Sequence, residues 1–449
     1  MTGVPTTART RADACPGVVS PHLAADGALA RVRLPGGRIT AAALRAVAAL
    51  AGAAGDGAVH LTSRGNLQLR GLDPGDPRPV RELAAAGLLP SVTHERVRNV
   101  LASPLSGITG GLADVRGLAA ALDRGLCARP ELAALPGRFL IAFDDGRGDV
   151  AGERPDLCWV AVSVTAGELV VAGTGTGLHC ALGDAPDLLL DAAAAFLELR
   201  DTHTADPAAR AWRAAELPDA ARRLADTLSG PHRASRPGGA RRPDATLDGT
   251  GAGEQGGHGR VGELGGGALG VAPVLGELSV AQLEVLAGHA PELLVTPWRT
   301  LVLPGPHPDA RTARTALRDT GLVVDPGHPA LRVSACAGTP GCAKSLADVR
   351  GDARALLRTG DTATVHVSGC ARRCGAPHTP HTDAVATEPG AYLRDGTGPA
   401  HPLPLITRDD DGPDGPTPPP LPRAATPPCG CPPADPAPPT PHDRPRSHH

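Results

Sequence analysis

The sequence predicts an α+β protein with an internal duplication, and three observations lead to this prediction. A helix followed by two short strands and a tight turn occurs near the N-terminus and again after residue 270. Each copy precedes a stretch that mixes strand-like apolar runs with a helix. A Gly-rich stretch separates the two halves, and the C-terminal residues are rich in proline. We therefore expect four folded segments, one linker and one disordered tail.

The two copies of the helix and hairpin align residue by residue. In the first copy, Thr40 is the candidate N-cap of a helix. In the second copy, Ser279 and Gln282 have the spacing of a capping box. When Thr62 is set on Thr296, the apolar residues and the glycine that follow also coincide. This agreement in helix, hairpin and spacing indicates a duplicated unit.

A larger α/β piece follows each copy. The expected strands cover residues 139–143, 157–164, 167–173, 331–336 and 363–370, and the expected helices cover 186–201 and 344–359. The domain boundaries that follow are 13–75, 90–235, 271–326 and 330–395 for the folded segments, 236–270 for the linker and 400–449 for the tail.

Composition excludes several classes of protein. A net charge of −3 argues against a dedicated nucleic-acid binder. No apolar run approaches the roughly 18 residues of a membrane span, and the N-terminus lacks the apolar region of a secretory peptide. We therefore expect a cytoplasmic protein with reduced cysteines. All basic residues except Lys344 are arginine, so any anion site must be built from guanidinium groups.

Four cysteines form the most specific pattern. Cys336 and Cys342 are separated by five residues, Cys370 and Cys374 by three, and each pair follows a predicted strand. Four thiolates at adjacent strand ends can hold one metal centre, which favours a [4Fe–4S] cluster. Structural zinc, whose ligand spacing is usually shorter, and four unrelated buried thiols are the alternatives.

The remaining cysteines and histidines are less specific. We expect Cys15, Cys127, Cys158 and Cys180 to be small buried side chains. Cys429 and Cys431 form a CGC in the predicted tail, whose role the sequence leaves open. Possible iron ligands are His60, His94 and His366, although a lone histidine more often has a structural role.

The cysteine pattern, the duplicated unit and the segment HLTSRGNLQLRG resemble the sirohaem sulfite and nitrite reductases. The resemblance implies a sulfite/nitrite-reductase-like architecture with two ferredoxin-like half-domains (13–75 and 271–326) and two α/β domains (90–235 and 330–395). It also implies that the four cysteines bind a [4Fe–4S] cluster, and that Cys374 bridges it to a tetrapyrrole iron.

Anion-binding residues of that family come from three motifs. Arg64 in LTSRGNLQL matches the first motif, and Arg98 in ERVRNVLASPLSG matches the second. The third motif normally carries two lysines, and here those positions hold Arg138 and Leu140. A leucine can neither deliver a proton nor bind an anion, so the sequence departs from a reductase at this point.

A second resemblance accounts for that departure. The opening segment DACPGVVSPHLAADGALARVRLPGGRIT is similar to the start of the precorrin-3B synthases of aerobic cobalamin biosynthesis, over roughly residues 13–395. The resemblance implies O2-dependent hydroxylation of precorrin-3A with lactone formation. The cofactors it implies are a [4Fe–4S] cluster, a mononuclear non-haem iron and NADH-derived electrons that arrive through a ferredoxin or reductase.

The arginines then acquire an expected role. A uroporphyrin-derived tetrapyrrole carries many carboxylate arms, which pair bidentately with guanidinium groups. Arg64, Arg98 and Arg138 are the candidate carboxylate or anion ligands, with Arg96 and Asn99 as neighbours of open role. A sirohaem-dependent sulfite or nitrite reductase is the alternative enzyme. A non-enzymatic Fe–S or zinc protein that docks partners through its Pro-rich tail is the alternative from another class.

Overall fold

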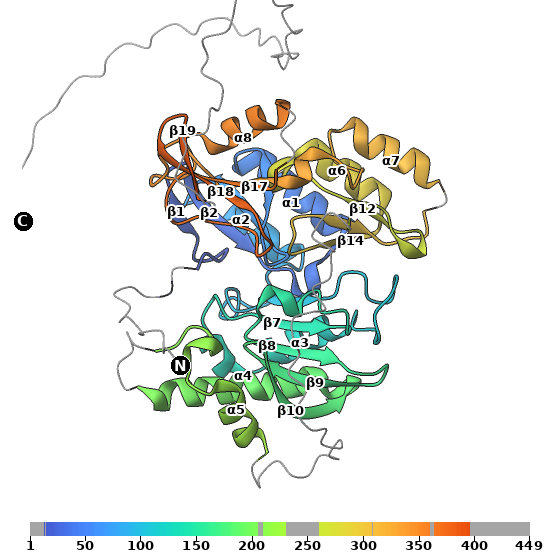
Figure 1. Cartoon of the computed structure of the whole chain (residues 1–449), viewed down its shortest axis with the longest axis vertical. Coiled ribbons are helices and arrows are strands. Elements are labelled where there is room, and N and C mark those ends of the chain that lie inside the picture. Colours follow the sequence, from blue (N-terminus) through green and yellow to red (C-terminus); the bar gives the residue numbers. More distant parts are fainter. Residues whose placement is uncertain are drawn as a thin grey trace, which may run out of the picture. The chain divides into compact units, whose positions relative to one another are not determined.

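The computed structural model describes residues 13, 15–204, 210–229, 260–307, 309–359 and 363–395. The predicted tail 400–449, the CGC at Cys429 and Cys431, and most of the predicted linker lie outside these residues. The described residues form a mixed α and β protein with four sheets (Figure 1). Within the described ranges, the helices are all too short or too polar to cross a membrane.

Eight α-helices are described. Their bounds are α1 Ala41–Ala54, α2 Arg78–Ala85, α3 Leu118–Cys127, α4 Ala185–His203, α5 Ala220–Leu228, α6 Val280–His289, α7 Ala310–Asp319 and α8 Val349–Arg358. The two helix starts predicted from the duplication are confirmed. The Thr40 hydroxyl accepts the Ala43 N–H at α1, and Ser279 and Gln282 form a complete capping box at α6.

Two antiparallel sheets exchange one strand with each other. The first sheet runs in the order β1 His22–Ala24, β2 Gly27–Val32, β5 Leu67–Leu72, β4 Ala58–Leu61 and β13 Glu277–Ser279. The second runs in the order β11 Gly262–Glu263, β12 Leu269–Val271, β15 Leu301–Leu303, β14 Glu292–Val295 and β3 Arg38–Thr40. Thus β13 from the second copy pairs with β4, and β3 from the first copy pairs with β14.

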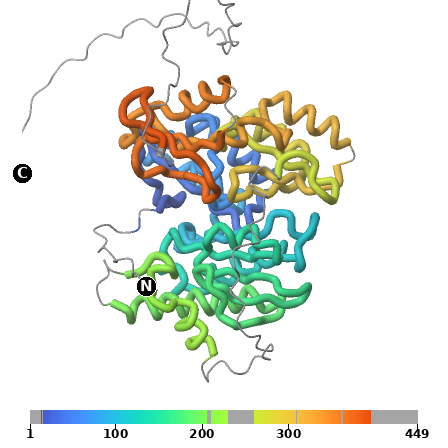
Figure 2. Tube along the Cα trace, viewed as in Figure 1, coloured from blue at the N-terminus to red at the C-terminus, as the bar shows by residue number. Residues whose placement is uncertain are grey.

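The exchange joins the two copies into one body. Helices α1 and α6, which follow the exchanged strands, pack against each other, and the residues of both copies share one apolar core. In Figure 2 the segments of the two copies accordingly lie side by side. The sequence predicted two half-domains but not this exchange, because a three-residue strand ahead of a helix has too little pattern to reveal its partner.

The hairpin turns of the two copies have the same geometry. The Thr62 N–H donates to the Asn66 carbonyl at 3.0 Å, and the Thr296 N–H donates to the Thr300 carbonyl at 2.9 Å. Both turns contain a residue in the left-handed region, Gly65 at φ 62° and Arg299 at φ 58°. The alignment predicted from Thr62 and Thr296 is therefore confirmed, with an arginine where the first copy uses glycine.

The predicted linker 236–270 extends too far towards the C-terminus. Residues 262–263 and 269–271 form β11 and β12 at the edge of the second sheet. The glycines that suggested a linker instead allow close packing, since a Cβ at Gly270 would lie 1.8 Å from the Arg260 carbonyl oxygen. Composition alone could not separate this edge from a true linker.

The third sheet carries most of the aromatic core. Its strands, in spatial order, are β10 Thr174–Ala181, β9 Ala166–Val171, β8 Leu157–Ala161, β7 Ile141–Asp144 and β6 Val100–Ala102. Helices α3, α4 and α5 accompany it, as Figure 1 shows. Strands β6 and β10 were not expected from the sequence. The first is short, and glycine interrupts the apolar pattern of the second.

The fourth sheet positions the cysteines. Its strands are β16 Val333–Ala335, β17 Val365–Ser368, β18 Thr382–Glu388 and β19 Ala391–Asp395. Strands β16, β17 and β18 are parallel to one another, and α8 packs against the first two. Because parallel strands end at the same edge, the loops after β16 and β17 leave the sheet side by side.

Candidate functional site

The structure brings the two cysteine loops together at the end of the fourth sheet. Cys336 follows β16, and its N–H donates to the Val367 carbonyl in β17 at 3.0 Å. The Gly369 N–H donates to the Cys336 sulfur at 3.3 Å, just ahead of Cys370. The predicted placement of both pairs beyond adjacent strands therefore agrees with the fold.

The four thiols of Cys336, Cys342, Cys370 and Cys374, termed the cysteine site, lie close enough to interact. Burial raises the pKa of Cys374, and the thiols of Cys336, Cys370 and Cys342 raise it further. Cys374 is exposed, whereas the other three are half-buried. Two cysteine-bearing loops at one end of a sheet are the arrangement that a tetrathiolate centre requires, although no three of these sulfur atoms lie within 4.8 Å of one another among the described residues.

Neighbouring residues fix the loops that carry these thiols. A Cβ at Gly369 would lie 1.8 Å from the Ser345 hydroxyl oxygen, so glycine is required beside Cys370. Arg70 in β5 pairs bidentately with Asp26, at 2.8 and 2.9 Å, and also donates to the Gly341 carbonyl. The first sheet thereby holds the loop of Cys342.

A cavity of about 320 Å³, termed the Trp298 cavity, begins at the residue after Cys374. The loop 375–380 forms one wall, the hairpin turn 297–300 forms another, and Ser63 and Glu153 also contribute. The cavity therefore adjoins the cysteine site and receives residues from both copies of the duplicated unit.

Glu153, at the end of a short 3-10 helix (Ala151–Glu153), is the acid of this cavity. Its side chain is only 10% exposed. Burial raises its pKa to about 7 against the opposing effect of a hydrogen bond from Trp298. Arg260 lies over the Trp298 ring, with its guanidinium carbon 3.2 Å from the ring centroid. No local motif surrounds Glu153, so the sequence did not predict it as a site residue.

Arg64 lies in the hairpin turn of the first copy, directly after Ser63, which lines the Trp298 cavity. It donates to the Gly137 carbonyl at 3.5 Å. Burial, together with the positive charges of Arg213 and Arg31, lowers its pKa to about 10. A guanidinium held among other guanidiniums is stabilised by an anion, so this location suits a carboxylate-bearing ligand.

Two further arginines, which the sequence analysis missed, lie beside Arg64. Arg33 is 2% exposed, and within the described residues its Nε and Nη1 have no hydrogen-bond partner. The Arg31 Nε is also unpaired there, and burial lowers the pKa of both groups. Arg31 lies in β2 and Arg33 directly follows the end of that strand, so their spacing of two residues in an extended segment could have revealed them.

Arg98 and Asn99 do not line the Trp298 cavity. Arg98 is 4% exposed, and its Nε and Nη2 donate to both carboxylate oxygens of Asp123 at 2.7 and 2.8 Å. Asn99 is fully buried and donates to the carbonyls of Gly137 and Phe139 at 2.9 and 3.3 Å. In this structure both side chains serve the protein's own packing.

The third motif presents only one charged group. Arg138 is exposed and lies over Trp212, at 5.8 Å from the ring centroid. Leu140 is 3% exposed and packs among apolar residues that include Leu101 and Cys158. Arg96 donates to the Asp13 carbonyl at 3.0 Å and lines a separate cavity of about 360 Å³. A leucine thus replaces the second basic group in the interior.

The three histidines considered as iron ligands are dispersed. His60 pairs with Asp56 at 2.9 Å, and His94 contacts the hydroxyl of Ser91 at 2.8 Å. His366 is fully buried in β17, where burial lowers its pKa to about 4. Among the described residues, none of these histidines joins a group of three potential metal ligands.

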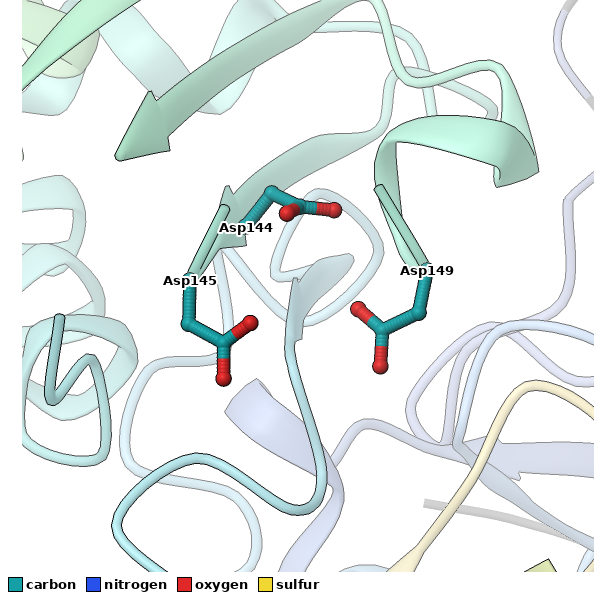
Figure 3. Close-up of side chains that lie close together, drawn as sticks. All are labelled: Asp144, Asp145 and Asp149. Atoms are coloured by element: carbon teal, nitrogen blue, oxygen red, sulfur yellow. The ribbon is translucent and has the colours of Figure 1, made fainter. Parts of the chain in front are cut away.

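The one such group in the described ranges consists of Asp144, Asp145 and Asp149, whose carboxylate oxygens lie within 4.8 Å of one another (Figure 3). Protein donors already hold all three. Asp144 accepts four backbone N–H groups, those of Gly146, Gly148, Val150 and Ala151. Asp145 pairs bidentately with Arg147. Asp149 accepts the Ser103 hydroxyl and Arg260. These carboxylates form a structural junction.

Comparison with known proteins first defines the class. Residues 22–87 match the family described as the nitrite/sulfite reductase ferredoxin-like half domain. The solved structure of the Mycobacterium tuberculosis NirA protein matches with a TM-score of 0.65 and 22% identity, covering 84% of this chain and 77% of that one. The chain therefore shares the fold of the NirA structure, and residues 22–87 are similar to a nitrite/sulfite reductase ferredoxin-like half domain.

Over almost the whole chain, the sequence is similar to a precorrin-3B synthase. The Sinorhizobium sp. enzyme is 27% identical over 428 residues, which cover 91% of this chain and 87% of the relative. The ferredoxin–nitrite reductase of Synechococcus elongatus is 36% identical over 140 residues, which cover 29% of this chain and 27% of the relative. The resemblance and the fold class predicted from the sequence are confirmed.

Proposed function

We propose that the chain is a precorrin-3B synthase, an Fe–S monooxygenase that hydroxylates precorrin-3A with O2 and forms a lactone in cobalamin biosynthesis. The observation that carries the proposal is the similarity to a precorrin-3B synthase over 91% of the chain. The buried Leu140 supports it, because a reductase of this superfamily is expected to carry a basic, proton-delivering group at that position.

The balance of the reaction defines what the protein must supply. One oxygen atom enters a C–H bond of the macrocycle, and the other is reduced to water by two electrons and two protons. The electrons come from an external donor, a ferredoxin or an NADH-linked reductase. A [4Fe–4S] cluster, when bound by the cysteine site, supplies one-electron transfer.

The arginine group would bind the macrocycle. We assign Arg64, Arg31 and Arg33 to the carboxylate arms, because their guanidinium groups are buried close together and two of them carry unpaired N–H groups. Arg138, exposed at the third motif, would reach an outer arm. Arg98 would act indirectly, since Asp123 already occupies its guanidinium.

The described residues do not offer a mononuclear iron site. Their only group of three converging potential ligands is the aspartate junction, and its oxygens are already held by N–H, hydroxyl and guanidinium donors. We therefore assign no step to such an iron.

A sirohaem-dependent sulfite or nitrite reductase is the second candidate. The 36% identity to the Synechococcus nitrite reductase over 140 residues favours it, and so does the arginine group, which also suits an inorganic anion. A reductase would keep sirohaem as a permanent cofactor, so the isolated protein would contain it.

Anaerobic purification followed by assays with precorrin-3A separates the two candidates. Protein made in a host that synthesises sirohaem should contain iron and sulfide without a stoichiometric sirohaem band. It should consume O2 when precorrin-3A and reducing equivalents are supplied, and it should not reduce sulfite or nitrite. One tightly bound sirohaem per chain together with sulfite reduction would overturn the proposal. On the synthase proposal, the protein works in the cytoplasm.

A further inference from the structure

Glu153 differs from the other buried carboxylates near the Trp298 cavity. Asp156, three residues later, accepts the Arg213 guanidinium and the N–H groups of Leu140 and Ala214 at 2.7 to 2.8 Å. Its oxygens are therefore occupied by structural partners. Glu153 instead lines the cavity itself, where its polar neighbours are the Trp298 indole and the His378 imidazole.

His378 connects this carboxyl group with solvent. Its Nε2 lies 4.0 Å from a Glu153 carboxylate oxygen, and its side chain is 47% exposed. A small rotation of the exposed ring, or one bridging water, closes a hydrogen bond across this distance. His378 also lines the cavity, in the loop that follows Cys374. Glu153 and the half-exposed His378 imidazole thus lie side by side in the wall of the cavity that adjoins the cysteine site.

We propose that Glu153 is the general acid of this enzyme, and that His378 returns protons to it from solvent. The proposal rests on the proposed monooxygenase function. The Glu153 O–H gives one proton to the oxygen atom that leaves as water, and the resulting carboxylate takes a proton from His378. Glu153, protonated again in this way, gives the second proton that the water requires. O2 is the oxidant, and the external ferredoxin or reductase supplies both electrons.

The charges around the pair support this direction of transfer. Burial is the main cause that raises the pKa of Glu153, Asp149 raises it further, and Trp298, Arg260 and Arg299 oppose the increase. Burial also lowers the pKa of His378, together with the positive charges of Arg154, Arg213 and Arg64. A protonated His378 is therefore an easy proton donor, and Glu153 titrates close to neutral pH, where a general acid is most effective.

The test compares Glu153→Gln with the wild type and with Glu131→Gln, a matched change at an exposed glutamate outside the cavity. Glutamine keeps the size and an oxygen for the Trp298 indole but carries no transferable proton. We expect Glu153→Gln to lower kcat by about 10²- to 10⁴-fold. The Fe–S absorption and the affinity for the tetrapyrrole should stay unchanged. The rate of the wild type should fall above neutral pH, whereas the rate of Glu153→Gln should not show this fall.

A second measurement does not require turnover. Infrared difference spectroscopy of the wild type should show the carbonyl band of a buried protonated carboxylic acid, titrating at about pH 7. The band should be absent in Glu153→Gln and retained in Glu131→Gln. If Glu153→Gln folds poorly, Glu153→Asp should keep a shifted band and part of the rate.

The outcomes distinguish this proposal from the function on which it rests. A wild type that does not oxygenate precorrin-3A refutes the proposed function, and the acid role falls with it. A wild type that oxygenates, with a Glu153→Gln variant of equal rate and equal pH profile, refutes the acid role alone. For His378, His378→Asn should slow turnover, and imidazole in solution should restore the rate because the site is exposed. A His378→Asn variant with the wild-type rate would remove His378 from the route.

Discussion

Replacing Arg98 should reveal a structural ion pair. Arg98→Met keeps the apolar stem but removes the guanidinium, which leaves the Asp123 carboxylate without its bidentate partner in a largely buried place. The side chains of Arg98 and Asp123 are 5% and 16% exposed, and Arg98 also donates to the Leu88 carbonyl at 3.4 Å. We therefore expect this substitution mainly to lower the free energy of unfolding, although the sequence predicted Arg98 to be a substrate ligand.

The size of the effect follows from burial. Removing one partner of a buried pair costs about 3–5 kcal/mol, whereas replacing both partners by neutral groups costs much less. Because Asp123 keeps some contact with solvent, we expect the lower end, about 3 kcal/mol, for Arg98→Met and for Asp123→Asn. The double variant should recover part of this loss, giving a favourable coupling energy of about 2 kcal/mol.

Urea unfolding followed by circular dichroism measures these free energies, and a tetrapyrrole titration measures affinity separately. Arg129→Met is the matched control, because the Arg129–Asp191 pair has side chains 30% and 20% exposed. Such a pair should contribute no more than about 1 kcal/mol. An Arg98→Met variant with unchanged unfolding free energy and a weakened affinity would refute this reasoning and restore Arg98 as a ligand.

The cysteine site, the arginine group and the loop glycine give three further predictions. Cys370→Ala should abolish the Fe–S absorption while Cys15→Ala retains it; full iron and sulfide in Cys370→Ala would contradict the ligand assignment. Arg64→Ala should weaken tetrapyrrole binding by about 1.5–3 kcal/mol, because one charge-assisted pair is lost, and the Fe–S absorption should stay intact. Equal affinity of the variant and the wild type in a titration would exclude Arg64 as a carboxylate ligand. Gly369→Ala should reduce the iron content, because its methyl group would collide with Ser345; a normal iron content would show that the loop can shift.

The sequence predicted those parts of the fold that depend on local pattern. The caps at Thr40 and Ser279 were predictable because one side chain and the next backbone N–H groups define them. The two turns could be aligned because Thr62 and Thr296 hold them by the same backbone hydrogen bond. The exchange of β3 and β13 was not predictable, since a pairing between segments more than 200 residues apart leaves no local pattern.

The candidate site was predicted in part for the same reason. Paired spacing identified the cysteines, and their positions after parallel strands agree with it. Arg98 carried the family motif, yet its environment is set by Asp123 on α3, which the motif does not contain. Glu153 carried no motif at all, because its position as the acid of the cavity depends on residues near 298 and 378.

The stability of the protein should report the burial of Glu153 without any assay of function. Its pKa is raised from 4.5 to about 7 in the folded state, so folding favours the protonated form. Its contribution to stability is therefore fully present below pH 4.5 and is lost as the pH rises through about 7. The shift corresponds to about 3 kcal/mol, and Glu153→Gln, which never ionises, should not show this loss.

Urea unfolding of the wild type and of Glu153→Gln, from acidic to mildly alkaline pH, measures the difference between their free energies of unfolding. The titration of other carboxylates affects both proteins equally and largely cancels in this difference. Glu131→Gln should differ from the wild type by the same small amount at every pH, because Glu131 is exposed. A difference between wild type and Glu153→Gln that does not change with pH would mean that solvent reaches Glu153, and that its pKa is an ordinary one.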